Sequence, residues 1–296
     1  MTHQTEWAEA KLSEVRLSGD RLTQDQQLLV TPYPHCPLCE STALAPVGVA
    51  DCRRHEIWHP PLPETLGWLR CAGCDHVFTE GFYTEAGLAE LFRKANPGQL
   101  AGGDPERQRL VWAPVVRRVL ETLACRSELF RRSDPPAPGW LDVGCGAGGL
   151  VFTAAEFGFA AVGLDLRQEA VRRLQDLGYQ ARCGDIFADQ PEQPFQVVSM
   201  ADLLEHTPYP KIVLARAREL LAPEGSLFVS CPNRECASWR EMDRKNANPY
   251  WMEIEHHHNF SRRSLLGLLT ECGFRPVDYS VSQRYIACME IVAVRR

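Results

Sequence analysis

The sequence predicts an α/β fold with a doubly wound, mostly parallel sheet, preceded by a smaller cysteine-rich module. Two observations support the sheet. Apolar strand patterns alternate with helical patterns from residue 140 onward, and residues 140–149 run from a buried strand directly into a glycine-rich turn. Two closely spaced cysteine pairs before residue 80 indicate the module. The chain is therefore expected to hold one α/β domain with an N-terminal appendage.

The elements of the sheet follow a helix-breaking, proline-rich linker at 133–139. The expected strands are apolar runs at 140–144, 161–165, a short one ending near 184–185, 195–201 and 226–230. The expected helices between them each carry an apolar face and cover 147–157, 167–177 and 209–221. In the tail, a helix over 264–272 is expected between an N-cap at Ser261 and a stop at Gly273, followed by adjacent strands at 276–282 and 285–294.

Changes in composition divide the chain into four expected segments. These are a polar arm at 1–31, a cysteine-rich module at 32–80, a helical cap with the linker at 81–135, and the sheet domain at 136–296. The module is too small and irregular to hold a conventional core, so a structural staple is expected there.

The bulk composition excludes several classes of protein. A net charge of -6 and a pI near 5.9 argue against a general binder of nucleic acid or membrane surfaces. They are compatible with a local basic groove that binds RNA. The N-terminus is too polar for a signal peptide, and no apolar run approaches the ~18 residues of a membrane span. We therefore expect a cytoplasmic protein whose twelve cysteines are thiols or metal ligands.

The two cysteine pairs predict a structural zinc site. Cys36 and Cys39 form one C-x2-C knuckle, and Cys71 and Cys74 form the other about thirty residues later. Four thiolates suit tetrahedral zinc and leave no coordination position for a substrate. His76 is an alternative to Cys74 in a Cys₃His site, and a redox-active C-x-x-C is a second alternative.

The glycine-rich turn predicts a pocket for a nucleotide-type cofactor. Gly144, Gly146 and Gly148 follow the strand at a point where a Cβ would obstruct both a positive φ and the approach of a ligand to the backbone. Together with Gly149 the turn also satisfies G-x-G-x-x-G, so a dinucleotide is the alternative ligand.

Asp142-x-Gly144-x-Gly146-x-Gly148 resembles the first motif of class I S-adenosylmethionine-dependent methyltransferases, and the resemblance covers roughly residues 140–274. It implies a Rossmann-like, seven-stranded methyltransferase sheet, with the N-terminal module as a zinc ribbon. It also implies that S-adenosylmethionine is bound by residues that follow successive strands. Asp142 would accept from the ammonium, Asp165 from the ribose hydroxyls and Asp185 from the adenine amine; Leu166, Ile186 and Ala201 would complete the pocket.

The run Asp202-Leu203-Leu204-Glu205-His206 resembles the fourth motif of small-molecule methyltransferases of the ubiquinone O-methyltransferase type. If the run begins a helical turn, its three polar side chains share one face. His206 is then the candidate general base for a methyl transfer. The alternative is that Glu205 and His206 only shape the loop through backbone hydrogen bonds.

His258-x-Phe260 resembles the segment that completes a metal site in small-RNA 3′-end 2′-O-methyltransferases. That resemblance implies a divalent ion held by Asp202, Glu205, His206 and His258, although Asp replaces the first Glu of the motif. The plainer interpretation is that one histidine of 256–258 lines the acceptor pocket and the others face solvent.

The sequence as a whole predicts a zinc-containing methyltransferase that transfers a methyl group to oxygen or carbon of a small molecule. The alternatives are an RNA methyltransferase that grips RNA with the zinc module, which the acidic charge disfavours, and a non-catalytic S-adenosylmethionine-binding or scaffold protein. The acceptor and the oligomeric state do not follow from the sequence.

Overall fold

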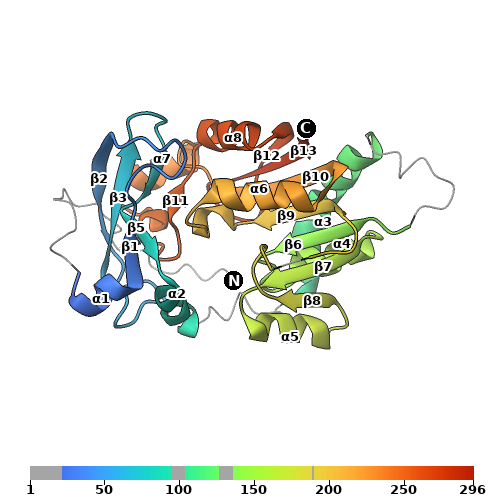
Figure 1. Ribbon diagram of the computed structural model, residues 1–296, viewed down its shortest axis with the longest axis horizontal. Coiled ribbons are helices and arrows are strands. Elements are labelled where there is room, and N and C mark those ends of the chain that lie inside the picture. The colour runs from blue at the N-terminus through green and yellow to red at the C-terminus, as the bar shows by residue number, and fades with distance from the viewer. Residues whose placement is uncertain (1–21, 95–103, 127–135, 189) are drawn as a thin grey trace. The chain divides into compact units, whose positions relative to one another are not determined.

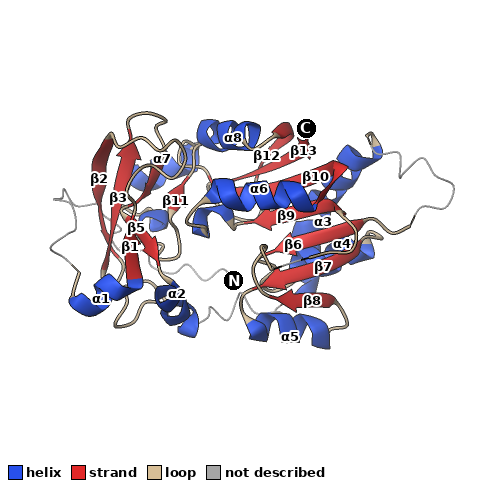
Figure 2. Ribbon diagram, in the orientation of Figure 1, coloured by secondary structure: helices blue, strands red, loops and turns tan. Residues whose placement is uncertain are grey.

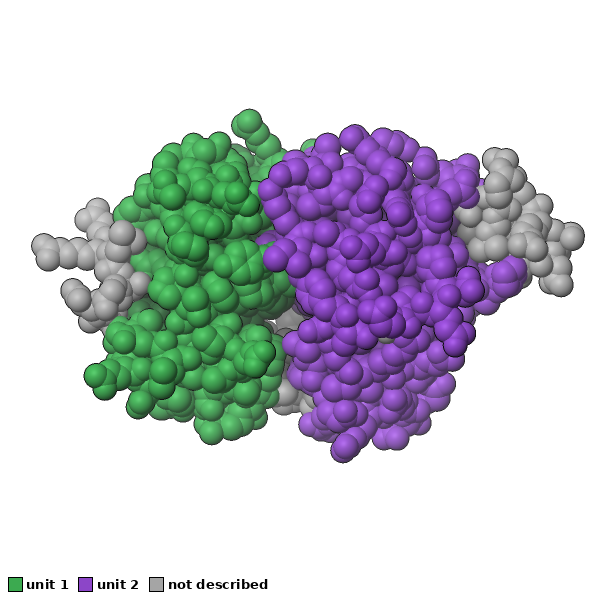
Figure 3. All heavy atoms as spheres, in the orientation of Figure 1, with its two compact units in different colours: residues 1–95, 205–209, 232–264 green, residues 96–204, 210–231, 265–296 purple. Residues whose placement is uncertain are grey.

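The computed structural model describes residues 22–94, 104–126, 136–188 and 190–296. The chain forms two compact units, coloured separately in Figure 3. The N-terminal unit comprises residues 1–95, 205–209 and 232–264, and the sheet unit comprises 96–204, 210–231 and 265–296.

The sheet unit is built on seven strands in the order β12-β13-β10-β9-β6-β7-β8 (Figure 1). The parallel strands are β6 (Gly139–Val143), β7 (Ala160–Asp165), β8 (Gln180–Cys183), β9 (Phe195–Ala201) and β10 (Leu221–Pro232). The last two strands, β12 (Phe274–Val281) and β13 (Cys288–Arg295), pair antiparallel. The predicted doubly wound, seven-stranded sheet is confirmed.

The helices of this unit alternate with its strands, as Figure 2 shows, and are α3 (Pro105–Ala124), α4 (Gly149–Glu156), α5 (Gln168–Asp176), α6 (Pro210–Leu220) and α8 (Arg262–Glu271). The hydroxyl of Ser261 accepts from the backbone N–H of Ser264, and Gly273 ends the last helix with φ +82°. Both ends of the tail helix therefore follow the sequence prediction.

Helix α3 is part of the sheet unit rather than of a separate cap. Its apolar face buries Val115, Val116, Val119 and Leu123 in one cluster with Val151 of α4 and Trp140 of β6. Burial of these aliphatic side chains is the main free-energy gain available to such a helix. The expected boundary at residue 135 is therefore wrong for this helix.

The N-terminal unit has a four-stranded sheet in the order β11-β4-β3-β2 and a two-stranded sheet of β1 and β5. The strands are β1 (Val30–Pro32), β2 (Leu44–Asp51), β3 (Thr65–Cys71), β4 (Val77–Thr79), β5 (Gly81–Tyr83) and β11 (His258–Asn259). The helices are α1 (Gln24–Leu29), α2 (Glu85–Leu91), α7 (Ala237–Arg244) and the 3₁₀ turns η2 (Phe92–Lys94) and η6 (Pro249–Trp251).

Residues 232–264 belong to the N-terminal unit, which corrects the expected continuous domain 136–296. Strand β11 pairs antiparallel with β4, matching His258 to Phe78 and Asn259 to Val77. The indole N–H of Trp68 donates to the carbonyl of Trp251 at 2.9 Å. Strand pairing and this buried hydrogen bond join segments that lie far apart in the sequence. In the described part of the chain, no helix has both the length and the apolar character needed to span a bilayer.

Candidate cofactor and active-site residues

The glycine-rich turn connects β6 to α4 and requires its glycines. Gly144, Gly146 and Gly148 have φ of +73°, +48° and +78°. A Cβ at Gly144 would lie 2.9 Å from Leu203, and one at Gly148 would lie 2.5 Å from Leu174. The turn is therefore closed to larger residues by both conformation and packing.

Asp142 is buried at the end of β6, with 3% of its surface exposed. The Ser199 hydroxyl donates to its Oδ1 at 2.6 Å, and Ser199 in turn accepts from the Trp140 indole. Burial raises the pKa of Asp142 to about 7, and the nearby Asp165 carboxylate acts in the same direction, whereas the Ser199 hydrogen bond opposes the rise. A cationic ligand group beside this buried carboxylate would strongly stabilise its ionised form.

Asp165 ends β7 and holds the glycine turn in place. Its Oδ2 accepts from the Gly146 N–H at 2.9 Å, and its Oδ1 accepts from the backbone N–H of Arg167 at 2.9 Å. The Arg167 guanidinium also binds both carboxylate oxygens, at 3.0 and 3.1 Å. A ribose diol bound to Asp165 would share the carboxylate with that guanidinium.

The remaining expected cofactor residues lie at the ends of β7, β8 and β9. Leu166 is 55% exposed, and Ile186 is buried. Asp185 is exposed, and its Oδ1 accepts from the N–H groups of Phe187 and Ala188, both at 2.9 Å. Ala201 is the last residue of β9 and is half-buried.

Two residues of α3 that the sequence interpretation missed lie against the glycine turn. A Cβ at Gly149 would lie 2.4 Å from the Gln108 Oε1 and 2.7 Å from the Trp112 Nε1. The two side chains also bond to each other, with the indole N–H donating at 3.0 Å. The apolar periodicity of α3 identifies its core face only, so nothing in the sequence marked these positions.

Asp202 lies outside the short helical turn that contains Glu205 and His206. It follows β9 with φ +53°, and the helical turn η5 covers only Leu204–His206. Its carboxylate accepts from Arg284 at 2.7 Å and from the Ser230 hydroxyl at 2.8 Å. The expectation that the three polar side chains share one helical face is wrong, because the left-handed residue ends the strand before the turn begins.

Glu205 and His206 instead group with His256 in the N-terminal unit. One ligand atom from each lies within 4.8 Å of the others. The two imidazole rings meet edge to face at 4.7 Å between centroids. The His206 Nδ1 lies 3.0 Å from the Glu255 carbonyl, which only accepts, so Nδ1 donates this hydrogen bond.

A further carboxylate, Glu253, is charged beside this group. Burial by itself would raise its pKa, but the hydrogen bond from His55 at 2.5 Å and the neighbouring histidines lower the pKa overall. Burial also lowers the pKa of His256 to about 3, with His206 acting in the same direction. His256 is therefore neutral at physiological pH and has a buried Nδ1 with no hydrogen-bond partner.

His258 has a different environment from the one expected. Its Nε2 lies 2.8 Å from the Thr207 carbonyl, and its Nδ1 lies 3.1 Å from the His76 Nε2. Both ring nitrogens are thus occupied, which leaves neither for a metal ion. His256, His257 and His258 are all at most 7% exposed, so the expectation that two of them face solvent is wrong.

The four expected cysteine ligands come together. The Sγ atoms of Cys36 and Cys74 are 3.6 Å apart, those of Cys39 and Cys71 are 3.4 Å apart, and all four lie within 4.8 Å of one another. The residue after each knuckle, Glu40 or Asp75, has φ 60°. The two C-x2-C segments therefore form matching turns.

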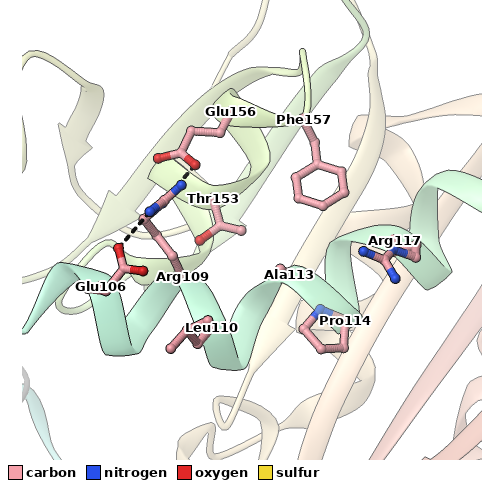
Figure 4. Close-up of a pocket in the computed structure, with 9 residues that line it drawn as sticks. All are labelled: Glu106, Arg109, Leu110, Ala113, Pro114, Arg117, Thr153, Glu156 and Phe157. Carbon is pink, nitrogen blue, oxygen red and sulfur yellow. Dashed lines mark hydrogen bonds and ion pairs between the residues drawn. The ribbon is translucent and has the colours of Figure 1, made fainter.

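A surface groove of about 360 Å³ lies between α3 and the C-terminal half of α4. Figure 4 labels the residues that line it. Arg109 lies across it and pairs with Glu106 at 2.6 Å and Glu156 at 2.8 Å. The glycine turn is at the opposite, N-terminal end of α4. We assign no ligand to this groove.

The sheet order, the left-handed glycine turn and the carboxylates at the ends of β6 and β7 define a class of cofactor-binding α/β proteins. A family model described as a methyltransferase domain matches residues 110–279, which is more than half of the chain. The chain belongs to this methyltransferase-domain family.

Curated relatives match a shorter segment. The chain is 36% identical over 107 residues to the ubiquinone biosynthesis O-methyltransferase of Idiomarina loihiensis, covering 33% of this chain and 44% of the relative. It is 34% identical over 102 residues to the enzyme of the same description from Nitrosococcus oceani, covering 32% and 43%. The chain thus spans less than half the length of these relatives.

Solved structures of low identity also match the chain. Magnesium protoporphyrin IX methyltransferase from Synechocystis PCC 6803, with bound SAH, is 17% identical with a TM-score of 0.49, covering 72% of this chain and 95% of that one. The N-methyltransferase NodS from Bradyrhizobium japonicum is 17% identical with a TM-score of 0.47, covering 69% and 94%.

Proposed function

We propose that this protein transfers the methyl group of S-adenosylmethionine to an oxygen or carbon atom of a small molecule. The observation that carries the proposal is the glycine turn between Asp142 and Asp165, inside a chain of the methyltransferase-domain family. Three left-handed glycines bring the chain to the N-terminus of α4, where backbone N–H groups can bind an anionic ligand group, and the two carboxylates suit an ammonium and a ribose diol. These features fit the cofactor.

When bound, S-adenosylmethionine supplies an electrophilic methyl group on a sulfonium. Asp142 binds and orients the cationic amino-acid end, and Asp165 orients the ribose. Trp112 and Gln108 of α3 pack against the glycine turn at Gly149. Positioning of the acceptor in line with the methyl group contributes most of the rate enhancement in such a displacement.

His206 is proposed as the general base that takes the proton of the acceptor. Its Nδ1 hydrogen bond to the Glu255 carbonyl leaves Nε2 able to accept a proton, which is the arrangement that base catalysis requires. Glu205 lies beside it, and its carboxylate would stabilise the resulting imidazolium. A base of this kind contributes ~10² to 10⁴ in rate.

A divalent ion on His206 is the alternative to its role as general base, because Nε2 is the one ring nitrogen left for either a proton or a metal ion. The ligand set of such an ion differs from the one expected. Asp202 is paired with Arg284, and His258 is occupied at both ring nitrogens. The donors that remain together are Glu205, His206 and His256, a carboxylate with two imidazoles. This set suits Mn²⁺, Fe²⁺ or Zn²⁺ better than Mg²⁺, because imidazole is a nitrogen donor of intermediate softness.

We also propose that the cysteine cluster binds one structural zinc ion. Tetrahedral zinc with Zn–S bonds of about 2.3 Å places its sulfur atoms roughly 3.8 Å apart, close to the separations of 3.4 and 3.6 Å. Cys74 rather than His76 is the fourth ligand in this proposal, because the Cys74 Sγ lies within 4.8 Å of the other three thiols.

Calorimetric titration with S-adenosylmethionine, S-adenosylhomocysteine and NAD tests the cofactor. Binding of the first two without NAD supports the proposal, whereas binding of NAD alone contradicts it. Transfer of labelled methyl groups is then measured against catechols and sugar nucleotides, with His206→Gln as the matched inactive control. Labelling of RNA in place of both small-molecule classes would overturn the acceptor class.

A further inference from the structure

A half-buried ion pair lies at the end of β9, next to the turn that the cofactor proposal uses. Arg284 is 5% exposed in its side chain and binds the Asp202 Oδ2 at 2.7 Å. Its Nη2 donates to the Ser230 hydroxyl at 2.6 Å, and its Nε donates to Glu290 at 3.1 Å. The guanidinium therefore has a partner on each side and a single orientation.

Two contacts place this pair at the glycine turn. Leu203, the neighbour of Asp202, would meet a Cβ on Gly144 at 2.9 Å. The Arg284 guanidinium lies 4.0 Å from the ring centroid of Trp112, and Trp112 lies against Gly149. The ion pair is thus flanked at both ends by groups that touch the turn.

The charges around the turn are otherwise mostly negative. Asp142 and Asp165 end the two neighbouring strands, and Arg167 lies on Asp165. Asp202 adds a third carboxylate and Arg284 offsets it. A change at either member of the pair would change the local charge by one in a poorly solvated region, where charges interact more strongly than in water.

We infer that the Asp202–Arg284 pair sets the relative affinity of the site for S-adenosylmethionine and S-adenosylhomocysteine. The inference rests on the proposed function. The two molecules differ at sulfur by one positive charge and one methyl group, so the local charge balance discriminates between them. Asp202 then acts through its negative charge and does not act as a proton acceptor. Arg284 is the residue that holds the Asp202 carboxylate in position.

The test measures dissociation constants of both molecules by calorimetry for the wild type, Asp202→Asn, Arg284→Met and the double variant. One unit charge at roughly 8 Å and an effective dielectric of about 40 changes an affinity ratio about fivefold. Asp202→Asn should shift the ratio about fivefold toward S-adenosylhomocysteine, and Arg284→Met should shift it by a similar factor toward S-adenosylmethionine. The double variant should return close to the wild-type ratio.

The control is Arg109→Met, which removes an equal charge at the other end of α4 and should leave the ratio within about twofold. Ratios that stay within twofold in both single variants overturn the inference, since a purely structural role would weaken both ligands together. If Arg284→Met does not fold, Arg284→Lys and Asp202→Asn decide the question: the lysine variant keeps the ratio and the asparagine variant shifts it. A wild type that binds neither molecule would instead refute the proposed function.

Discussion

Replacement of Asp142 by asparagine is expected to stabilise the free protein at alkaline pH and to weaken cofactor binding. Burial raises the pKa of Asp142 from 3.8 to about 7. Because the folded-state pKa is raised, the stability associated with the protonated group is fully present below about pH 3.8 and is lost as the pH rises through about 7. The groups that face this carboxyl are Ser199, Asp165, Asp202 and Arg284.

The size of the effect follows from the two pKa values. Their difference corresponds to about 4 kcal/mol at ~1.36 kcal/mol per unit. Asp142→Asn should therefore gain roughly 2–4 kcal/mol over the wild type at pH 8.5 and at most about 1 kcal/mol at pH 4.5. For a domain of this size the gain corresponds to a rise in Tm of about 4–16 °C. Asp176→Asn, at an exposed carboxylate, is the control and should show no such pH dependence.

Cofactor binding should respond in the opposite direction. A bound ammonium favours the ionised carboxylate, so binding should release a proton near pH 7, and the affinity of the wild type should rise toward that pH from pH 5.5. Calorimetry in buffers of different ionisation enthalpy counts the released proton. A stability difference between wild type and Asp142→Asn that does not vary with pH, or binding without proton release at pH 6.5, would refute this reasoning.

Three further predictions concern the N-terminal unit. Elemental analysis of Cys39→Ser should show the loss of one equivalent of zinc, and its Tm should fall. The control Cys125→Ser, at an exposed thiol, should retain the metal. Zinc kept in both variants would exclude the four-thiolate site. His206→Gln should lower kcat by ~10² to 10⁴ with little change in cofactor affinity, while His258→Gln should mainly lower Tm, because its two buried hydrogen bonds are lost. Mn²⁺ added to the zinc-loaded protein should give a bound electron paramagnetic resonance signal that Glu205→Gln abolishes, and an identical signal in both would place the ion elsewhere.

Local sequence patterns were sufficient to predict the sheet unit because its elements depend on neighbouring residues. The apolar run at 195–201 matches β9, and Ser261 and Gly273 bound the tail helix through contacts within a few residues of the chain. The glycines at 144, 146 and 148 were identifiable because left-handed backbone conformations select glycine. The pairing of Cys36 and Cys39 with Cys71 and Cys74 was predictable from thiolate chemistry and spacing.

Only the tertiary structure decided which polar side chains meet. The carboxylate of one left-handed residue, Asp202, bonds to Arg284, eighty-two positions along the chain. Pairing of β11 with β4 placed residues 232–264 in the N-terminal unit and brought His256, rather than His258, to His206. Such contacts depend on long-range strand pairing and on single backbone dihedral angles. Neither produces a periodic pattern that can be recognised in one sequence. The sequence by itself therefore determined the class of fold and the cofactor turn, whereas packing determined the charge partners and the histidine group.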